Sequence, residues 1–257
     1  MSDCFEVIAV KYATVDRVRK SNFLLPVDGD PDASMALDFF VWLVVGHGTV
    51  MLVDTGFSPA SALVRNRQYL ASPVELIRRL GYAPQDVRDL VITHLHYDHA
   101  GNIGDFPAAN IWVQEREVRY ATGVCMCDPK QNHFFSTDDV ACLIKRLYQG
   151  NVRLVDGFHQ VRDGIELHRV GGHTDGPQVV RVRTTRGWIV LASDAAHYQE
   201  NLIKENPFPA IYSLDDMLEG YALIRELADG EDNIVPGHDP QVCLRFPSVG
   251  MHAHRIA

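Results

Sequence analysis

Three histidines and one aspartate occupy four of six consecutive positions, at His94, His96, Asp98 and His99. The apolar run 87–92 before them predicts a buried strand, so the polar segment lies on the loop that follows this strand. In an extended loop, alternation would point His94, His96 and Asp98 to one side. Imidazoles and carboxylates bind zinc and similar divalent ions, so the segment predicts a metal site at a strand end.

Three further polar residues occupy the same kind of position elsewhere in the chain. His173 lies in a glycine-flanked segment at a predicted strand end, where the backbone can approach a bound ion closely. Asp194 follows the predicted strand 188–191, and His238 follows the short apolar segment 233–235. Because all three lie beyond the C-terminal end of a predicted strand, we interpret them as part of one site with the first four.

Seven ligands are too many for one tetrahedral zinc ion. They fit two ions that share a carboxylate and hold a water molecule between them. Two nearby cations lower the pKa of that water toward neutrality, so the site predicts hydrolysis. The expected cofactors are two Zn²⁺ per chain, with Fe, Mn or Co as alternatives. Without a metal, the same residues would form a polar surface loop or hydrogen-bonded core histidines.

Two other features bear on metal binding. Asp54 ends the apolar segment 49–53, and we expect it to accept hydrogen bonds from backbone or from a ligand imidazole rather than to contact a metal. Cys125 and Cys127 form a CxC pair that could bind a metal through thiolates, but no second cysteine pair lies nearby. We therefore prefer to interpret the pair as small buried residues.

Apolar periodicity predicts the elements around these residues. Strands are expected at 39–45, 49–53, 87–92, 110–114, 165–170, 179–183 and 188–191. Helices are expected at 73–80, at 115–121, from 137 onward and at 213–227, and the stretch 122–136 is expected to be a loop or flap. Strands dominate both halves and helices intervene. The expected fold class is therefore α/β, with two sheets packed face to face in a four-layer αββα sandwich.

The composition limits the domain count and the partners. At 257 residues with 46% hydrophobic content, the chain can bury a sizeable core, and we expect one domain over residues 1–257. The formal net charge of −9 disfavours nucleic acid and anionic membranes as partners. The expected partner is a small-molecule substrate, and a homo-oligomer stays an open alternative.

The expected location is cytoplasmic. Five cysteines without paired spacing argue against a disulfide scaffold and for a reducing compartment. The N-terminus carries Asp3 and Glu6 instead of the basic and long apolar segments of a signal peptide, and the run 39–45 is too short to span a bilayer. His252 and His254 are expected in a flexible C-terminal end, because no predicted strand precedes them.

The motifs THLHYDHAGN, GGH, SDA and PGHD, preceded by VDTG, resemble those of the metallo-β-lactamase superfamily, and the resemblance covers essentially the whole chain. Within that superfamily the sequence is most similar to the N-acyl-homoserine lactonase-like group, which includes quorum-quenching lactonases, γ-butyrolactone hydrolases and pyridoxolactonase-type enzymes. The resemblance implies the αββα sandwich and a zinc-dependent lactonase that opens a small or N-acylated ring. Enzymes that cleave β-lactams depart from the HxHxDH ligand set, so the pair Asp98 and His99 argues against a β-lactam substrate.

The resemblance also implies a role for each residue. One metal would be bound by His94, His96 and His173, the other by Asp98, His99 and His238, with Asp194 bridging the two. A hydroxide held between the metals would attack the ring carbonyl, and Asp98 would pass a proton to the departing alkoxide.

One position departs from the family pattern. Lactonases of this group commonly place a tyrosine three residues after the bridging aspartate, where it hydrogen-bonds the substrate carbonyl, whereas here that position is His197 and the tyrosine is Tyr198. Either residue could make this contact, or both could simply line the cleft. Apolar loop residues at 23–25, 134–135 and 206–208 are candidates for binding an acyl chain, and holding the loops to the core is the alternative.

Other functions would use the same ligands. A hydrolase of a linear ester or a thioester would use the same hydroxide. An oxygen-reducing di-iron protein would normally need a flavin domain or partner, for which the chain leaves no room. A catalytically silent metal-binding module would not need seven ligands. The negative charge disfavours the RNA-processing branch of the superfamily.

Overall fold

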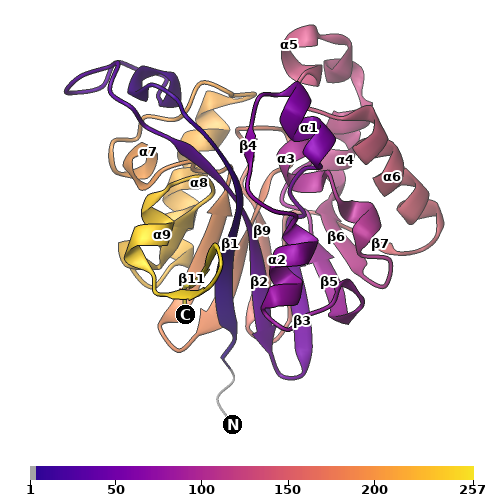
Figure 1. The fold of residues 1–257 in the computed structure, drawn as a ribbon. Helices are drawn as coiled ribbons and strands as arrows, with labels where there is room; N and C mark the ends of the chain where they lie inside the picture. Colours follow the sequence, from indigo (N-terminus) through magenta and orange to yellow (C-terminus); the bar gives the residue numbers. More distant parts are fainter. Residues whose placement is uncertain (1–3) are drawn as a thin grey trace.

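The computed structural model describes residues 4–257, in which two β-sheets are flanked by helices (Figure 1). Asp3, one of the residues behind the expectation that no signal peptide is present, lies outside the described residues. Within the described part, one sheet has nine strands and the other has five.

The first sheet has the strand order β13-β14-β1-β2-β3-β5-β6-β7, and β4 pairs with β1. Its strands are β1 (Glu6–Val15), β2 (Leu37–Gly46), β3 (Thr49–Val53), β4 (Gln68–Tyr69), β5 (Val87–Val91), β6 (Asn110–Gln114), β7 (Val152–Val155), β13 (Ser248–Gly250) and β14 (Ala253–Arg255). The pairs β3–β5, β5–β6 and β6–β7 are parallel, so the C-terminal ends of these strands lie at the same edge of the sheet.

The second sheet has the strand order β12-β11-β10-β9-β8. Its strands are β8 (Phe158–Arg162), β9 (Ile165–Arg169), β10 (Gln178–Thr184), β11 (Gly187–Ser193) and β12 (Ile234–Pro236). The hairpin β10–β11 is antiparallel, whereas β11 and β12 run parallel and end side by side. This parallel pair brings Asp194 and the residues after Pro236 to one end of the sheet.

Alternating apolar residues along the strands build three separate cores. In β2, Val41 contacts the helices outside the first sheet, whereas Trp42 faces the second sheet. In β11, Leu191 shares the core between the sheets with Trp42, whereas Val190 packs toward the outer helix of the second sheet. Burying both faces of both sheets requires four layers, and the predicted αββα sandwich is confirmed.

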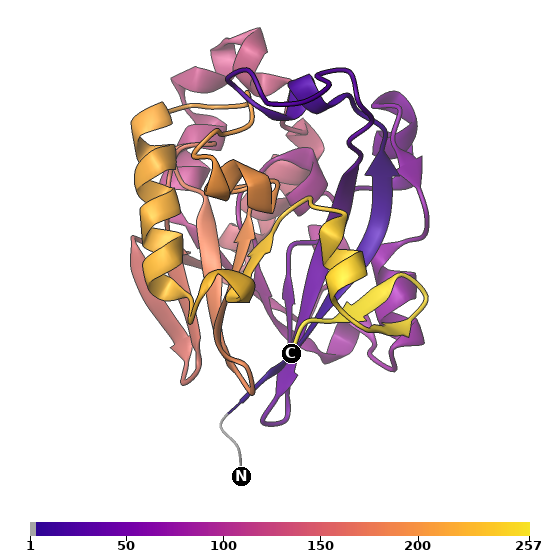
Figure 2. The same cartoon turned by 90° about the vertical axis from the view of Figure 1, so that its left-hand side faces the viewer.

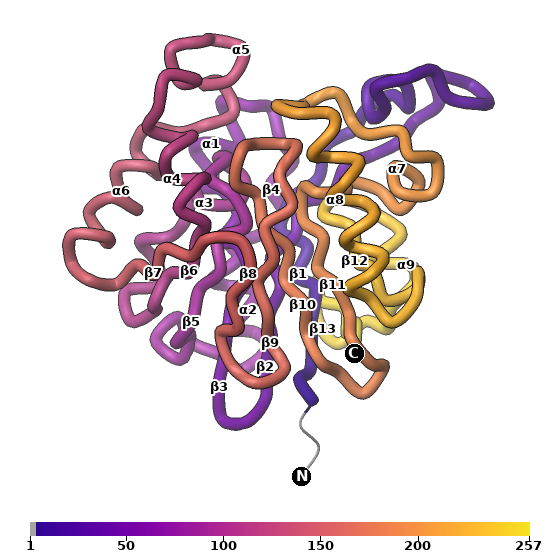
Figure 3. The backbone as a smooth tube through the Cα atoms, turned by 180° about the vertical axis from the view of Figure 1, so that it is seen from behind, coloured from indigo at the N-terminus to yellow at the C-terminus, as the bar shows by residue number. Residues whose placement is uncertain are grey.

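The helices cover the outer faces of the two sheets (Figures 2 and 3). Leu76 of α2 and Leu143 of α6 belong to the core outside the first sheet, and Tyr221 of α8 belongs to the core outside the second. The α-helices are α1 (Pro59–Val64), α2 (Pro73–Arg79), α3 (Tyr97–Ala100), α4 (Glu115–Thr122), α5 (Pro129–Asn132), α6 (Thr137–Tyr148), α7 (Gln199–Ile203), α8 (Leu214–Leu227) and α9 (Gln241–Arg245).

Each helix and strand predicted from apolar periodicity is present, and its predicted ends agree to within two residues. Ser213 caps α8, because its side chain accepts a hydrogen bond from the backbone N–H of Asp216. The stretch 122–136 contains a 3₁₀ turn and the single-turn helix α5. In the described residues, no helix has the length and apolar character needed to cross a membrane.

Two predictions about the chain ends and the cysteines are wrong. The C-terminal segment with His252 and His254 is not a flexible end, since β14 pairs with β1 in the first sheet through Ile8 and Arg255. Such short strands depend on a long-range partner for their stability, which local sequence does not reveal. Cys125 and Cys127 are not buried, because Cys125 is half-buried and Cys127 is exposed.

Candidate metal centre

The predicted ligands lie on loops that follow strands of both sheets. Residues 94–99 follow β5 and include α3, His173 lies between β9 and β10, Asp194 follows β11, and His238 follows β12. These loops meet at one end of the sandwich, and the structure brings all seven predicted ligands together there. Six of them are buried, and Asp98 is half-buried.

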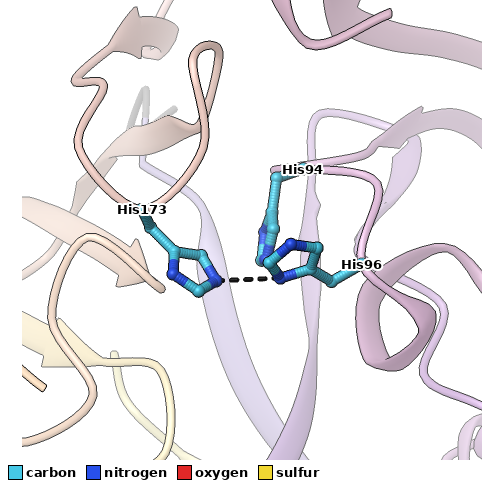
Figure 4. A group of neighbouring side chains, drawn as sticks. All are labelled: His94, His96 and His173. Atoms are coloured by element: carbon cyan, nitrogen blue, oxygen red, sulfur yellow. Dashed lines mark hydrogen bonds between the residues drawn. The ribbon is translucent and has the colours of Figure 1, made fainter. Parts of the chain in front are cut away.

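His94, His96 and His173 form a three-histidine group (Figure 4). His173 Nε2 lies 2.9 Å from His96 Nδ1, and the His94 ring centroid lies 4.6 Å from that of His96 and 4.9 Å from that of His173. Three imidazoles whose nitrogens converge in this way could ligate one divalent ion.

Asp98, His99 and His238 form a second, mixed group. Asp98 Oδ2 lies 3.8 Å from His99 Nε2 and 4.0 Å from His238 Nε2. The rings of His99 and His238 are 5.7 Å apart and nearly perpendicular. Two nitrogens and one carboxylate oxygen that face a common point could hold a second ion.

The carboxylate of Asp194 lies between the two groups. Its Oδ1 is 3.2 Å from His99 Nε2 and 2.9 Å from His238 Nε2, both in the mixed group. Its Oδ2 is 3.4 Å from His173 Nε2 and 3.8 Å from His94 Nε2, both in the three-histidine group. Each oxygen therefore faces a different group, which is the geometry of a bridging carboxylate.

Several polar atoms at the centre of the cluster have no hydrogen-bond partner. His94 Nε2, His99 Nε2 and Asp194 Oδ1 are buried and make no hydrogen bond of suitable angle with any described residue, although Asp194 Oδ1 lies within 3.2 Å of two imidazole nitrogens. A buried polar atom without a partner costs about 1–3 kcal/mol, so three of them in one place would destabilise the fold unless another group satisfied them. Divalent ions would do so, and the residues therefore fit the two metals that the sequence predicts.

The outer nitrogens of the imidazoles are held by the surrounding protein. His173 Nδ1 lies 2.6 Å from the carbonyl oxygen of Ala210, and His238 Nδ1 lies 2.6 Å from that of Asp38. His99 Nδ1 lies 2.7 Å from Asp54 Oδ2. Such contacts favour the tautomer whose Nε2 lone pair is free to bind a metal.

Asp54 has the supporting role that the sequence predicts. Besides bonding His99, its carboxylate accepts hydrogen bonds from the backbone N–H and the hydroxyl of Thr93, which precedes His94. Asp54 and Ser193 have positive φ angles of 61° and 44°, a strained conformation for residues other than glycine. Backbone strain of this kind clusters at functional sites, and here it occurs at two strand ends beside the ligands.

Burial and charge give the two groups different pKa values. Burial holds the pKa of His94 and His96 well below the usual range, and it also lowers the pKa of His173. At His99 and His238 burial acts in the same direction, but the neighbouring carboxylates, Asp194 foremost, together outweigh it and raise the pKa of both. The three-histidine group is therefore neutral at neutral pH, the form that binds metals, whereas protons compete for the mixed group.

Glu117 supports the site and was missed by the sequence analysis. Its buried carboxylate accepts hydrogen bonds from Leu95 N at 2.8 Å, from the Thr174 hydroxyl at 2.5 Å and from Gly176 N at 3.2 Å. It thereby ties the loop after β5 to the loop that carries His173. The helical spacing of Glu117 with the buried Tyr120 and Ala121 could have identified it, because it places a carboxylate on the apolar face of α4.

His197 and Tyr198 have different surroundings. His197 stacks on Phe208 with ring centroids 3.3 Å apart, and its Nε2 lies 2.9 Å from Asp194 Oδ2. Burial lowers the pKa of His197 to about 3, so the ring is neutral. The Tyr198 hydroxyl instead donates to the carbonyl oxygen of Ala36 at 3.0 Å, away from the cluster. Of the two candidates for the carbonyl contact, only His197 lines the cavity beside the ligands.

That cavity has a volume of about 690 Å³ and opens onto five of the seven ligands, His96, Asp98, His173, Asp194 and His238. Of the apolar loop residues suggested as an acyl-chain site, Phe134 and Phe208 line it. Phe23 is buried against Tyr198, and Leu24 and Leu25 are exposed outside the cavity. The segment 23–25 therefore does not form part of this cavity.

A family model described as the metallo-beta-lactamase superfamily matches residues 40–238, which include all seven predicted ligands. The match covers more than half of the chain, so this protein belongs to the metallo-β-lactamase superfamily. Together with the His/Asp cluster, this makes it an enzyme of the metallo-hydrolase class.

Curated relatives agree with the group that the sequence motifs indicate. The chain is 29% identical over 233 residues to an N-acyl homoserine lactonase of a Bacillus species, covering 82% of this chain and 87% of that protein. It is 27% identical over 248 residues to a probable metallo-hydrolase of Mycobacterium tuberculosis, covering 84% of this chain and 76% of that protein. The resemblance to the N-acyl-homoserine lactonase group is confirmed.

Solved structures show the same fold. A quorum-quenching N-acyl homoserine lactone lactonase superimposes with a TM-score of 0.76 at 23% identity, covering 93% of this chain and 94% of that one. A dizinc quorum-quenching lactonase superimposes with a TM-score of 0.70 at 15% identity, covering 92% and 88%. At these identities the likeness supports the αββα architecture alone.

Proposed function

We propose that this protein is a dinuclear zinc lactonase that opens a small or N-acylated lactone ring. The observation that carries the proposal is the position of Asp194, whose two oxygens face the three-histidine group and the mixed group separately. When bound, two zinc ions supply Lewis-acid activation of the carbonyl and a hydroxide at neutral pH. Similarity to N-acyl homoserine lactonases supports a lactone as the substrate.

The protein's own residues position the reaction and move the proton. Asp98 is half-buried and lines the cavity, so its carboxylate could accept the proton of the carboxylic acid formed by ring opening and pass it to the departing alkoxide. Because His197 is neutral and contacts Asp194, its role is to hold the bridging carboxylate in place. Tyr198 takes no part in this mechanism.

Two further observations bear on the substrate class and on the cellular location of the protein. Phe134 and Phe208 give the cavity an apolar side that suits the carbon skeleton of an ester. The five cysteines form no disulfide in the described residues, which supports a reducing, cytoplasmic location.

The test is a panel of lactones assayed by proton release with zinc-loaded protein, with and without a chelator. We expect turnover that disappears with the chelator, and about two zinc ions per chain by elemental analysis. His173→Ala should lose one ion and most activity, whereas His168→Ala, which changes a half-buried histidine paired with Glu166, should lose neither. Hydrolysis of linear esters or thioesters but of no lactone would overturn the proposal in favour of a different acyl substrate.

A further inference from the structure

Three arginines line the cavity beside the candidate ligands. Arg17, Arg65 and Arg67 line it together with the apolar Phe134 and Phe208. All three arginines are half-buried. This concentration of cations contrasts with the whole chain, whose formal net charge is −9.

These arginines form no ion pair with any carboxylate among residues 4–257. Arg17 donates to the carbonyl oxygen of Ser21, and Arg65 donates to that of His133. Arg67 donates to the Arg65 carbonyl at 2.9 Å and to the Tyr97 hydroxyl at 3.2 Å. All of these acceptors are neutral, so the positive charges in the cavity are not neutralised by the protein.

Arg19, two residues after Arg17, differs from these arginines because a carboxylate neutralises its charge. Its guanidinium forms a two-pronged ion pair with the carboxylate of Glu200, and it does not line the cavity. Within the cavity the only carboxylate outside the ligand cluster is that of Asp16, which is exposed. Asp16 cannot balance three arginines.

The arginines also repel one another. Burial lowers the pKa of Arg17, and the charge of Arg67 lowers it further, against an opposing effect of Tyr198. Half-buried like charges without a counter-ion are unfavourable unless an anion joins them. Arginine is suited to this purpose, because its planar guanidinium can donate two parallel hydrogen bonds to a carboxylate or a phosphate.

Aromatic rings connect the arginines to the ligand cluster. The Phe39 ring centroid lies 6.0 Å from Arg67 Cζ and 5.2 Å from the ring centroid of the ligand His238. Arg65 Cζ lies 3.8 Å from the ring centroid of Tyr97, the residue before Asp98. The Arg67 guanidinium is therefore about one aromatic ring away from the candidate ligand His238, a separation that a small molecule can span.

We propose that the substrate of this site carries an anionic group, a carboxylate or a phosphate, which binds Arg17 and Arg67 beside Arg65 while its ester lies at the metal ligands. This inference rests on the proposed function and narrows its substrate class. A neutral acyl chain would leave the arginines without a partner, whereas an anion would satisfy them.

The experiment compares matched lactones with zinc-loaded protein. A γ-butyrolactone with a carboxylate on the ring is compared with its primary amide, which has nearly the same shape and no charge, and with a phosphorylated hydroxymethyl analogue. We expect kcat/KM for the preferred anion to exceed that for the amide by roughly ten- to hundredfold, the value of a charged hydrogen-bonded pair. The better of the two anions identifies the group, and added salt should reduce its advantage.

Substitutions of single arginines test whether they cause the preference for the anionic lactone. Arg67→Gln and Arg17→Gln should each lower the ratio of kcat/KM for the anionic lactone to that for the amide by roughly tenfold. Arg67→Lys should recover part of the loss, since it keeps the charge but not the planar fork. Arg19→Gln is the matched control and should not change the preference. Equal kcat/KM for anion and amide in the wild type would overturn the inference and leave the lactonase function intact.

Binding of the ring-opened products tests the inference separately from turnover. Calorimetry should show tighter binding of the hydroxydicarboxylate than of the corresponding hydroxy-acid amide, and Arg67→Gln should abolish the difference. If no lactone is hydrolysed, the proposed function fails, and this comparison still decides the inference. Equal affinity for the two products in the wild type would overturn it.

Discussion

The two halves of the ligand cluster are supported by different buried carboxylates. In the mixed group, Asp54 bonds directly to the imidazole of the ligand His99. In the three-histidine group, Glu117 bonds to no imidazole and instead accepts hydrogen bonds from Leu95 and Gly176 in the two loops that carry the ligands. Asp54 therefore fixes a ring and its tautomer, whereas Glu117 fixes the positions of two loops.

The two groups also differ in their electrostatic surroundings. Carboxylates surround the mixed group and raise the pKa of its histidines, while the three-histidine group is dominated by burial and stays neutral. His96 is additionally packed between Phe134 and Phe135, with ring centroids 5.1 and 4.6 Å away. One group is thus organised by electrostatics and the other by packing, although both contain imidazoles that are candidate metal ligands.

Removing the carboxylate that joins the halves should have the largest effect. Because Asp194 faces both groups, Asp194→Ala should reduce the zinc content to one ion per chain or fewer. It should lower kcat by about 10³-fold or more, as the loss of a central electrostatic group does. Elemental analysis and a lactone assay measure both quantities, and circular dichroism controls for folding. Two ions and near-normal turnover in Asp194→Ala would contradict the bridging role.

The ionisation of Glu117 should be visible in the pH dependence of stability. Burial raises its pKa from 4.5 to about 7, so the folded protein holds this proton more tightly than the unfolded chain does. The stabilisation is complete below about pH 4.5 and is lost as the pH rises to about 7. Its size is on the order of 3 kcal/mol, about a hundredfold in the unfolding constant.

Glu117→Gln cannot titrate and serves as the reference for this measurement. The difference in unfolding free energy between wild type and Glu117→Gln, from denaturant titrations with saturating zinc, should fall between pH 5 and pH 7 and be constant above that range. A constant difference from pH 5 to 8 would show that Glu117 is already ionised at pH 5 in the folded protein, so that burial does not raise its pKa.

Removing the direct support of the mixed group should weaken only one of the two ions. Asp54→Ala leaves His99 Nδ1 without its carboxylate, and affinity at the mixed group should fall by about 10–100-fold. Asp89→Ala is the matched control, since Asp89 is a buried carboxylate of the same sheet whose partners are Trp112 and Arg162. Competition titrations with a chromophoric chelator would separate the two ions. If Asp54→Ala lowered the affinity for both ions equally, Asp54 would not support the mixed group alone.

Removing the indirect support should have the smallest effect on metal binding. Glu117→Ala releases the loops rather than a ligand, so affinity at the three-histidine group should fall by about tenfold, the lower end of the range for outer contacts. Glu115→Ala, on the same helix, removes only a surface pair with Arg119 and should leave both affinities unchanged. If Glu117→Ala instead lowered the metal affinity of the mixed group, Glu117 would not be the support of the three-histidine group.

The sequence identified the candidate ligands, which the structure brings together, because they share a local property, their position directly after an apolar strand. The same reasoning assigned Asp54 correctly, since it also ends a strand. It did not find Glu117, because Glu117 lies within a helix and not at a strand end. Its carboxylate is on the buried face of that helix. The sequence reasoning also treated Tyr198 as equivalent to His197, although Tyr198 bonds to Ala36 and only His197 faces the ligands.

The sequence by itself determined the layered fold, the seven candidate ligands and the family, because apolar alternation and the motif spacing are local along the chain. Only the tertiary structure decided how Asp194 lies between the two groups and which residues face the cavity. The arginines illustrate the reason, since Arg17 follows the first strand whereas Arg65 and Arg67 follow a helix that apolar periodicity did not predict. Their meeting in one cavity depends on the pairing of β4, which directly follows Arg67, with β1, and this is a long-range property that no local pattern encodes.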